Sequence, residues 1–438
     1  MLIAAIKSWA CKLAPFLFLL GSVSSSTAQQ VLNADFESDP AEKGWVTGGP
    51  SATWSFQDKA SGQSCLSIVS NQWSSPLIAT KPLQWYRLTF LSKTTGKKNN
   101  PGGSGYGYWS ATYVDGKGQA LNSDQYSAFM PSPDWVTNTF HIRAKVTVDS
   151  DGKLQPCQLR IGFHPIHGAP FFIDNVELTE THHSQAREWA DKFYATLPPL
   201  AYQPSQNRFR NLPQTISKLF AGSTLRVLML GDSVQQDTSN SPWELWVEKF
   251  WPGSKIEVIC STRGSTGVDF YKDHVEERIA RYRPDLLIIG GISNGTNMAH
   301  YASVIDQARA SGRKLGKEPE VLILTGAWSP NSFPNPNAYF FAPNLVELDP
   351  NPVRNLSAPL GFQIDLANLA SLKQCGFLDM TAVSSAYIYC PAKTAGFGPP
   401  DPKTGQPYDY WMRDTIHGND RAKLIMGKIL ATFFQPIR

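Results

Sequence analysis

The feature that most constrains the fold is a short apolar run at residues 225–230, which Gly231, Asp232 and Ser233 follow directly. An apolar run of this length between turn residues predicts a strand that is buried on both faces, as in a parallel sheet. Open α/β sheets carry their active sites at the carboxyl ends of such strands. Ser233 therefore stands where a nucleophile is expected, although Gly, Asp and Ser also form ordinary strand-to-helix turns.

The C-terminal half, residues 223–438, repeats this pattern. Further apolar runs occur at 256–259, 285–289 and 321–324, and amphipathic stretches separate them. Alternation of strands with helices predicts a three-layer α/β fold, in which helices cover both faces of a parallel sheet. The large aromatic residues after the first strand are expected to cover this sheet: Trp243, Trp246, Phe250 and Trp251.

Residues 29–180 have the pattern of an all-β domain. Short runs of alternating apolar and polar residues are separated by Gly, Pro, Asn and Asp, and no amphipathic helix interrupts them. This pattern predicts a β-sandwich or jelly roll. In the connecting residues 181–222, Ala186, Trp189 and Phe193 recur at helical spacing. We therefore expect a packed helical linker between the two domains.

Residues 1–28 have the three regions of a secretory signal peptide. Lys7 and Lys12 precede an apolar run at 16–20, and small residues lead up to Ala28. The run is too short to span a bilayer, so we expect cleavage after about Ala28 and a secreted or periplasmic product without a membrane span. Loss of both lysines changes the net charge from 40 − 36 = +4 to 38 − 36 = +2. A nearly neutral chain gives no reason to expect nucleic acid as a partner.

The cysteines indicate disulfides more than metal binding. All but one of the six cysteines follow the signal segment, and export permits disulfides. Cys65 could pair with Cys157, and Cys375 could pair with Cys390. The remaining number is odd, so at least one thiol is free, and Cys260 at the end of an apolar run is expected to be free. No Cys-x-x-Cys or histidine-rich spacing indicates a metal site.

Polar motifs also follow the second and third predicted strands. Gly264 comes after the second strand and Asn294 after the third. Near the carboxyl terminus, Asp414 and His417 are three residues apart, which puts both on the same side of a helical turn. The carboxylate could then hold one imidazole nitrogen while the other nitrogen faces a nucleophile, as acyl transfer requires.

On these motifs, the C-terminal half from the first apolar run onward resembles the SGNH (GDSL-type) hydrolases, which have a flavodoxin-like α/β fold. The resemblance implies that Ser233 is the nucleophile, His417 the base and Asp414 the residue that orients the histidine. It further implies that Gly264 and Asn294 donate hydrogen bonds to the oxyanion, beside the amide of Ser233.

The third motif departs from the family pattern, which is usually Gly-x-Asn-Asp. Asn294 lies one residue further from Gly291 than this spacing allows, whereas Asn297 keeps the spacing from Gly295 but lies further beyond the strand. Asn294 is the preferred oxyanion donor and Asn297 is the alternative. Asp232 resembles the loop-supporting aspartate of the first motif and takes no part in the chemical step.

The same segment contains a competing motif. Residues 291–295 match Gly-x-Ser-x-Gly, the nucleophile elbow of α/β-hydrolases, with Ser293 as the attacking residue. Those enzymes normally take their Asp and His from separate loops, whereas Asp414 and His417 form one short unit. The Gly-Asp-Ser after the first strand would also go unexplained, so Ser233 is preferred.

The N-terminal domain resembles a carbohydrate-binding jelly roll. The similarity rests on four places in the sequence: residues 33–37, 44–45, 135 and 172–178. Such modules often hold a structural calcium ion near their termini, which implies Asp35, Glu37 and Asp174 as oxygen ligands. The alternative is that these acids cap strand ends.

Aromatic residues of this domain are candidates for sugar contacts, because pyranose rings pack their apolar C–H faces on flat side chains. The strongest candidates are Tyr108 and Trp109, where glycines alternate with aromatics over residues 102–109. An edge strand with core aromatics would show the same pattern, so both interpretations stay open.

Together the two resemblances imply a secreted serine esterase that removes acyl groups, above all acetyl, from a carbohydrate or polysaccharide. The layout is similar to that of two-domain carbohydrate acetylesterases, and catalysis by such a triad needs no cofactor. Two alternatives remain: a lipase or acylhydrolase that acts on lipid esters, and a glycan-binding protein whose hydrolase domain is inactive.

Overall fold

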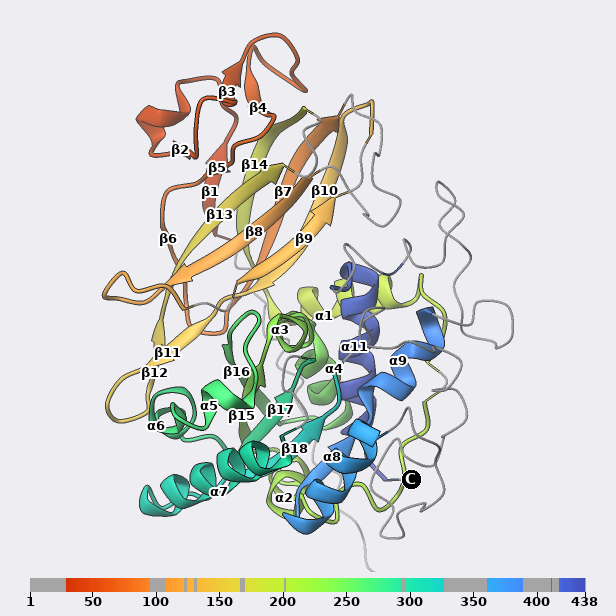
Figure 1. The fold of residues 1–438 in the computed structure, drawn as a ribbon. Coiled ribbons are helices and arrows are strands. Elements are labelled where there is room, and N and C mark those ends of the chain that lie inside the picture. Colours follow the sequence, from red (N-terminus) through yellow and green to blue (C-terminus); the bar gives the residue numbers. More distant parts are fainter. Residues whose placement is uncertain are drawn as a thin grey trace, which may run out of the picture.

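The chain folds into two parts that lie against each other (Figure 1). The computed structural model describes residues 29–94, 107–121, 124–129, 132–165, 170–200, 202–292, 297–326, 361–388, 411 and 417–437. An antiparallel part, residues 29–181, precedes a parallel part, residues 224–437. The predicted signal peptide lies outside the described residues. No helix within those residues is long and apolar enough to cross a membrane.

Two antiparallel sheets make up most of the first part, so its predicted all-β character is confirmed. The first sheet has the order β10 (Val136–Arg143), β7 (Trp85–Thr94), β14 (Phe171–Thr181), β4 (Cys65–Ile68) and β3 (Ala52–Ser55), with β1 (Gln30–Ala34) paired to β14. The second has the order β2 (Val46–Thr47), β5 (Trp73–Ser74), β13 (Gln158–Pro165), β8 (Gly107–Val114) and β9 (Gln125–Phe129), with β6 (Ile78–Ala79) paired to β13. A hairpin, β11 (Val146–Val148) and β12 (Leu154–Pro156), and a short 3-10 helix, η1 (Pro40–Lys43), also belong to this part.

Strand β8 shows how the sequence produces the core between the two sheets. Trp109, Ala111 and Tyr113 are buried, whereas Tyr108 is partly exposed. This alternation follows because successive side chains of a strand point to opposite faces. The ring of Trp109 packs against Phe140, with 5.0 Å between the centroids. Each large apolar side chain buried in this way stabilises the fold by about 2 kcal/mol.

Two helices lie in the connection, α1 (His183–Tyr194) and α2 (Pro213–Phe220). Ala186 and Ala190 of α1 are fully buried. Trp189 stacks on His141 of β10, with 4.4 Å between the ring centroids. Helix α1 is therefore packed against the antiparallel part.

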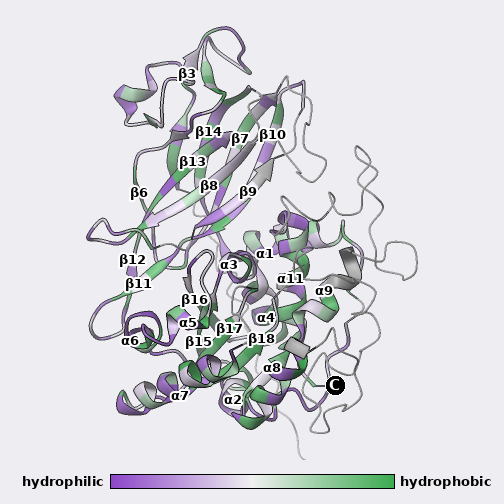
Figure 2. Ribbon diagram, in the orientation of Figure 1, coloured by the Kyte–Doolittle hydropathy of each residue, from purple (hydrophilic) through white to green (hydrophobic). Residues whose placement is uncertain are grey.

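The second part contains a parallel sheet of five strands, and the α/β prediction is confirmed. Their order is β16 (Lys255–Thr262), β15 (Thr224–Gly231), β17 (Leu286–Gly290), β18 (Glu320–Leu324) and β19 (Gly376–Leu378). Gly231 at the end of β15 pairs with Thr262 on one side and Gly290 on the other. The carboxyl ends of β16, β15 and β17 therefore lie side by side. Figure 2 shows hydrophobic residues concentrated in this sheet.

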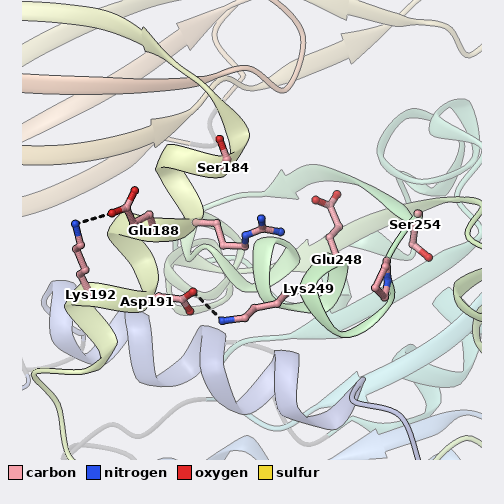
Figure 3. Close-up of a pocket in the computed structure, with 10 residues that line it drawn as sticks. Ser184, Glu188, Asp191, Lys192, Glu248, Lys249 and Ser254 are labelled. Atoms are coloured by element: carbon pink, nitrogen blue, oxygen red, sulfur yellow. Dashed lines mark hydrogen bonds and ion pairs between the residues drawn. The ribbon is translucent and has the colours of Figure 1, made fainter. Parts of the chain in front are cut away.

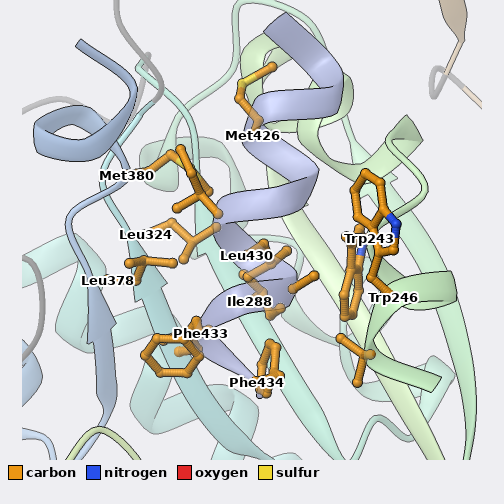
Figure 4. Close-up of a cluster of buried hydrophobic side chains, with 14 of the residues drawn as sticks. Trp243, Trp246, Ile288, Leu324, Leu378, Met380, Met426, Leu430, Phe433 and Phe434 are labelled. Atoms are coloured by element: carbon orange, nitrogen blue, oxygen red, sulfur yellow. The ribbon is translucent and has the colours of Figure 1, made fainter. Parts of the chain in front are cut away.

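Strand β15 divides its side chains between two cores, because its residues point alternately to the two faces of the sheet. Val227 and Met229 lie in the core drawn in Figure 4. This core includes residues of α4 (Trp243–Phe250), α9 (Met380–Ile388) and α11 (Asp420–Phe433). Leu228 and Leu230 lie in the opposite core. That core includes residues of α5 (Val268–Tyr271), α6 (Val275–Arg278), η2 (Ala280–Tyr282), α7 (Met298–Lys314) and α8 (Gly361–Leu372).

The cysteines correct one prediction and confirm another. Cys65 and Cys157 are buried and do not form a disulfide with each other, so the predicted Cys65–Cys157 bridge is wrong. The Cys65 thiol donates to the carbonyl of Asp58, and burial raises the pKa of both Cys65 and Cys157 to about 12. Cys260 forms no disulfide with another described cysteine, as expected, and its thiol lies 2.8 Å from Oγ of Ser239. Cys375 also forms no disulfide with a described cysteine, and its suggested partner at position 390 lies outside the described residues.

Candidate active site

Ser233 occupies the first turn of a helix that starts at the carboxyl edge of the sheet. Asp232 caps this helix, α3 (Ser233–Asn240), because its Oδ1 accepts hydrogen bonds from the amides of Val234 at 2.9 Å and Gln235 at 3.2 Å. Every residue from 227 to 247 is buried except Ser233. The fold therefore hides the turn and the helix and leaves only Ser233 among these residues partly exposed.

Gly231 lets the ends of β15 and β17 approach each other closely. Its φ is +149°, and a Cβ at this position would lie 2.0 Å from the carbonyl oxygen of Gly290. The carbonyl of Gly231 accepts hydrogen bonds from the amide of Arg263 at 2.9 Å and from the hydroxyl of Tyr271 at 2.7 Å. Burial raises the pKa of Tyr271, so its hydroxyl keeps its proton and acts as a donor. These contacts fix the strand ends below Ser233.

Asp232 also connects this turn to the loop after β17. Its Oδ2 accepts a hydrogen bond from the amide of Ile292 at 2.7 Å. Gly291, with φ of +107°, makes room for the carboxylate, since a Cβ there would lie 2.4 Å from Oδ1 of Asp232. Asp232 thus supports the loops and does not face the reacting groups.

His417 lies beside Ser233, although 184 residues separate them in the sequence. The distance from Nε2 of His417 to Oγ of Ser233 is 2.8 Å. Asn419, two residues later, caps α11 through its Oδ1, and its amide donates to the carbonyl of the buried Trp411 at 2.8 Å. His417 therefore lies two residues before a capped helix start whose amide is bound to Trp411. A hydrogen bond of this length allows the imidazole to take the proton of the hydroxyl.

The structure describes only some of the other predicted site residues. Asp414, Asn294 and Ser293 lie outside the described residues, so their predicted roles stay predictions. Asn297 caps α7, and its Oδ1 accepts hydrogen bonds from the amides of Ala299 at 3.1 Å and His300 at 3.3 Å. Gly264 is exposed beyond the end of β16, and a Cβ there would meet no atom of the described residues within 4 Å. The space over Gly264 can therefore admit a ligand.

The polar interior of α3 escaped the sequence-based predictions. The side chains of Gln236 and Asn240 donate to the carbonyl of Asp124 beside β9, the second at 3.2 Å. The polar run at residues 235–241 is typical of a helix exposed to solvent, so nothing in the sequence indicates that this helix is enclosed. Tyr271 was missed as well, since a tyrosine in a short helix gives no sign of reaching a strand end.

Of the two predicted sugar contacts, the structure excludes Trp109. Its ring is fully buried, so no face of the indole can take a sugar. Tyr108 points to the opposite face of β8, stacks on His164 at 4.5 Å with 4° between the ring planes, and lies 5.9 Å from Tyr126. The residue missed at this surface is His164, whose pKa burial lowers to about 4, and whose Nε2 lies 2.6 Å from the hydroxyl of Ser110.

The carboxylates proposed as calcium ligands are engaged by backbone donors. Asp174 accepts from the amides of Ala60, Ser61 and Asn175 at 2.8–3.2 Å, and burial raises its pKa. The oxygens of Glu37 accept from the amides of Gln63 and Ser64, just before β4, and Asp35 accepts from the amide of Glu37. Among the described residues, no group of three His, Cys, Asp or Glu side chains could hold a metal ion. The acids act as loop caps in this arrangement, and calcium binding by them stays a prediction.

A separate charged groove lies between α1 and α4 (Figure 3). Its charges neutralise one another: Glu188 pairs with Lys192 at 2.6 Å, and Asp191 pairs with Lys249 at 2.9 Å. Residues 252–254, directly before β16, also line the groove, so it lies at the opposite edge of the sheet from Ser233. A groove of paired charges on exposed side chains offers no group for catalysis.

No protein-family model and no curated protein matches this chain. Similar solved structures include a two-domain esterase (CEX) active on acetylated mannans, with 15% identity and a TM-score of 0.36 over 53% of this chain and 56% of that one. An acetyl xylan esterase, AlAXEase, has 14% identity and a TM-score of 0.32 over 47% of this chain and 98% of its own. The CBM22-1 xylan-binding domain of Paenibacillus barcinonensis Xyn10C has 13% identity and a TM-score of 0.26 over 35% of this chain and 95% of its own. The chain thus spans about half the length of the mannan esterase. At these identities and TM-scores no function follows from the similarities.

Proposed function

We propose that this protein is a serine esterase that removes acetyl or other short acyl groups from a carbohydrate. The observation that carries the proposal is the 2.8 Å contact between Oγ of Ser233 and Nε2 of His417, at the accessible end of an otherwise buried turn. Secretion after cleavage near Ala28 is part of the proposal, as is a layout of a jelly roll (29–180), a helical linker (181–222) and an SGNH-type hydrolase domain (223–438).

The reaction proceeds by acyl transfer through the serine. His417 takes the hydroxyl proton as Oγ of Ser233 attacks the ester carbonyl, and the imidazolium then gives that proton to the sugar oxygen that leaves. Water, activated by the same imidazole, releases the acid from the acyl-enzyme. We assign the orientation of His417 to Asp414. The developing oxyanion would be held by the amides of Ser233 and Gly264 and by the side chain of Asn294, with the open space over Gly264 as the place for the carbonyl.

The substrate class rests on the surface next to this site. Tyr108, Tyr126 and His164 offer flat rings on the outer face of the second antiparallel sheet. Strand β9, which carries Tyr126, is preceded by Asp124, whose carbonyl accepts hydrogen bonds from α3. A sugar chain that lies on these rings would therefore run toward the helix of Ser233. Flat rings with polar edges suit pyranose units better than a lipid acyl chain.

The test is hydrolysis of p-nitrophenyl esters of increasing acyl length and of a panel of acetylated polysaccharides. We expect turnover of the acetyl ester and weak turnover of long-chain esters, whereas a lipase would show the reverse order. Ser233→Ala should lower kcat by about 10³-fold or more, as removal of a triad member does. Ser293→Ala is the matched control and should keep the parental activity. The opposite result for the two serines would establish the competing Gly-x-Ser-x-Gly motif instead.

A further inference from the structure

Three buried cations lie where the antiparallel part meets the parallel part. Arg143, Lys145 and Lys423 are only 4%, 3% and 5% exposed. Removal of a cation from water costs several kcal/mol, and a buried ion pair often stabilises a fold no better than apolar residues of the same size. The groups that these cations contact therefore indicate a role for the buried charges other than stability.

Arg143 is the last residue of β10, and Lys145 lies two residues after it. Both side chains contact elements that carry the proposed site. The guanidinium of Arg143 pairs with Glu244 of α4 and donates to the carbonyl of Ser239 in α3. The ammonium of Lys145 donates to Oδ1 of Asn240 in α3 and lies 2.9 Å from the thiol sulfur of Cys260. Cys260 belongs to β16, the strand that ends just before Gly264. Both cations thus connect the antiparallel part to the helix of Ser233.

Lys423 makes the same connection from the other side. It lies in the first turn of α11, shortly after His417, and donates to the carbonyl of Tyr126 and, at 3.1 Å, to the hydroxyl of Ser127 in β9. Its ammonium is also 3.8 Å from the carboxylate of Asp237 in α3. One side chain therefore touches the antiparallel part, the helix of Ser233 and the helix that follows His417.

We propose that the antiparallel part is the frame that positions the active site, in which Arg143, Lys145 and Lys423 hold α3, β16 and α11 in register. They are positioning residues, because they contact the elements that carry Ser233 and His417 and not the reacting atoms. This inference rests on the proposed function and adds to it a role for the antiparallel part besides carbohydrate binding. A displacement of about 1 Å between reacting groups can cost about 10²-fold in rate.

The test measures kcat and KM with p-nitrophenyl acetate, which contains no sugar, so that loss of carbohydrate binding cannot affect the result. The variants are Lys145→Met, Lys423→Met and Lys423→Arg in the full chain. Burial alone would raise the pKa of the Cys260 thiol, and Lys145 and Arg143 bring it below its ordinary value. Loss of Lys145 raises the pKa of this thiol and so favours its neutral form, and the other contact of Lys145, Oδ1 of Asn240, is uncharged, so this variant is expected to fold.

We expect kcat to fall by about 10- to 10²-fold in both methionine variants, with KM within about twofold of the parent. Lys423→Arg should recover most of the loss, because its guanidinium can donate to the same groups. Lys93→Met is the control, since the ammonium of Lys93 pairs at 2.9 Å with Asp58 inside the antiparallel part. Hydrogen exchange of residues 233–240 should rise in Lys145→Met and stay at the parental level in Lys93→Met.

Each outcome decides between the two proposals. If the folded variants keep the parental kcat, or lose activity through KM alone, the positioning role is overturned while Ser233-dependent turnover of the parent keeps the proposed function. If the parent shows no Ser233-dependent turnover, the proposed function fails, and hydrogen exchange then tests the frame alone. Unchanged exchange of residues 233–240 in Lys145→Met overturns it. If Lys423→Met does not fold, Lys145→Met and Ser127→Ala carry the same test.

Discussion

Two glycines at neighbouring strand ends serve different purposes, and the difference can be tested. At Gly231 a Cβ would collide with the carbonyl of Gly290 at 2.0 Å, so this glycine is required by packing. At Gly264 a Cβ would meet no protein atom within 4 Å. A side chain at Gly264 could therefore disturb only what binds above it.

We expect Gly264→Ala to change the free energy of unfolding by less than about 0.5 kcal/mol, as exposed substitutions usually do. Its kcat/KM for acetyl esters should fall by about 10- to 10²-fold, because a methyl group then occupies the place of the carbonyl and its oxyanion. Kinetics together with urea unfolding check both halves of this prediction. Gly116→Ala is the matched control, since a Cβ at that exposed glycine also meets nothing within 4 Å.

A parental rate for Gly264→Ala would place the oxyanion elsewhere, and a large loss of stability would contradict the open space seen above this glycine.

At the scale of single residues, the sequence was informative where chemistry restricts the choice. Gly-Asp-Ser after a buried strand and a histidine before the last helix predicted the contact between Ser233 and His417. The prediction of a sugar contact failed for Trp109. The alternation of residues in β8 shows that neighbouring side chains face opposite ways, but it does not show which face is inward.

Among the secondary-structure elements, β10 is joined to α1 by a stack between His141 and Trp189. His141 is 7% exposed, and burial, with a smaller effect of the Arg87 charge, lowers its pKa to about 4. In the unfolded chain a histidine takes up a proton below about pH 6.5. Folded His141 stays neutral until the pH approaches 4, so the stability present above pH 6.5 is lost as the pH falls between these values.

His141→Phe should remove this loss and keep the stack on Trp189. Between pH 7 and pH 5 the parent should lose about 2 kcal/mol more unfolding free energy than the variant. Urea unfolding at both pH values measures the difference. His164 is unchanged in the variant, so its own contribution cancels in the comparison. Equal losses in the two proteins would mean that His141 takes up its proton in the folded state.

Element prediction succeeded for the long apolar strands and failed for short or enclosed ones. β15, β16, β17 and β18 follow from their runs of buried residues. β19 is three residues long, too short to show any periodicity, and only pairing with β18 defines it. The enclosure of α3 was also out of reach, since a run of polar residues indicates solvent unless the partners that cover it are known.

At the scale of the whole molecule, the hairpin β11–β12 contributes side chains to a core of the parallel part. Val146 and Val148 lie in the same hydrophobic cluster as Leu228 and Leu230 of β15. Three arginines of the parallel part donate to carbonyls of the hairpin and its turn, at 2.7–3.3 Å: Arg226, Arg281 and Arg283. Together with the buried cations beside α3, these contacts join the two parts at both the hairpin and the helix of Ser233.

The full chain should therefore unfold in a single transition, because exposure of either part would uncover the apolar and charged groups that the other part covers. Val148→Ala removes buried methyl groups from the shared core and should cost about 2 kcal/mol. Calorimetry should show one peak that moves to lower temperature in this variant. Hydrogen exchange should report the same loss of protection in β7 of the antiparallel part and in β17 of the parallel part, although β11 contains the only substitution.

Two resolved transitions, or a loss confined to the antiparallel part, would contradict a shared core and leave the chain as two independent units. A single transition would mean that a substitution in the antiparallel part affects the helix of Ser233 through the stability of the fold as well as through the position of the helix. Separate values of kcat and KM for the folded variants then distinguish the two effects.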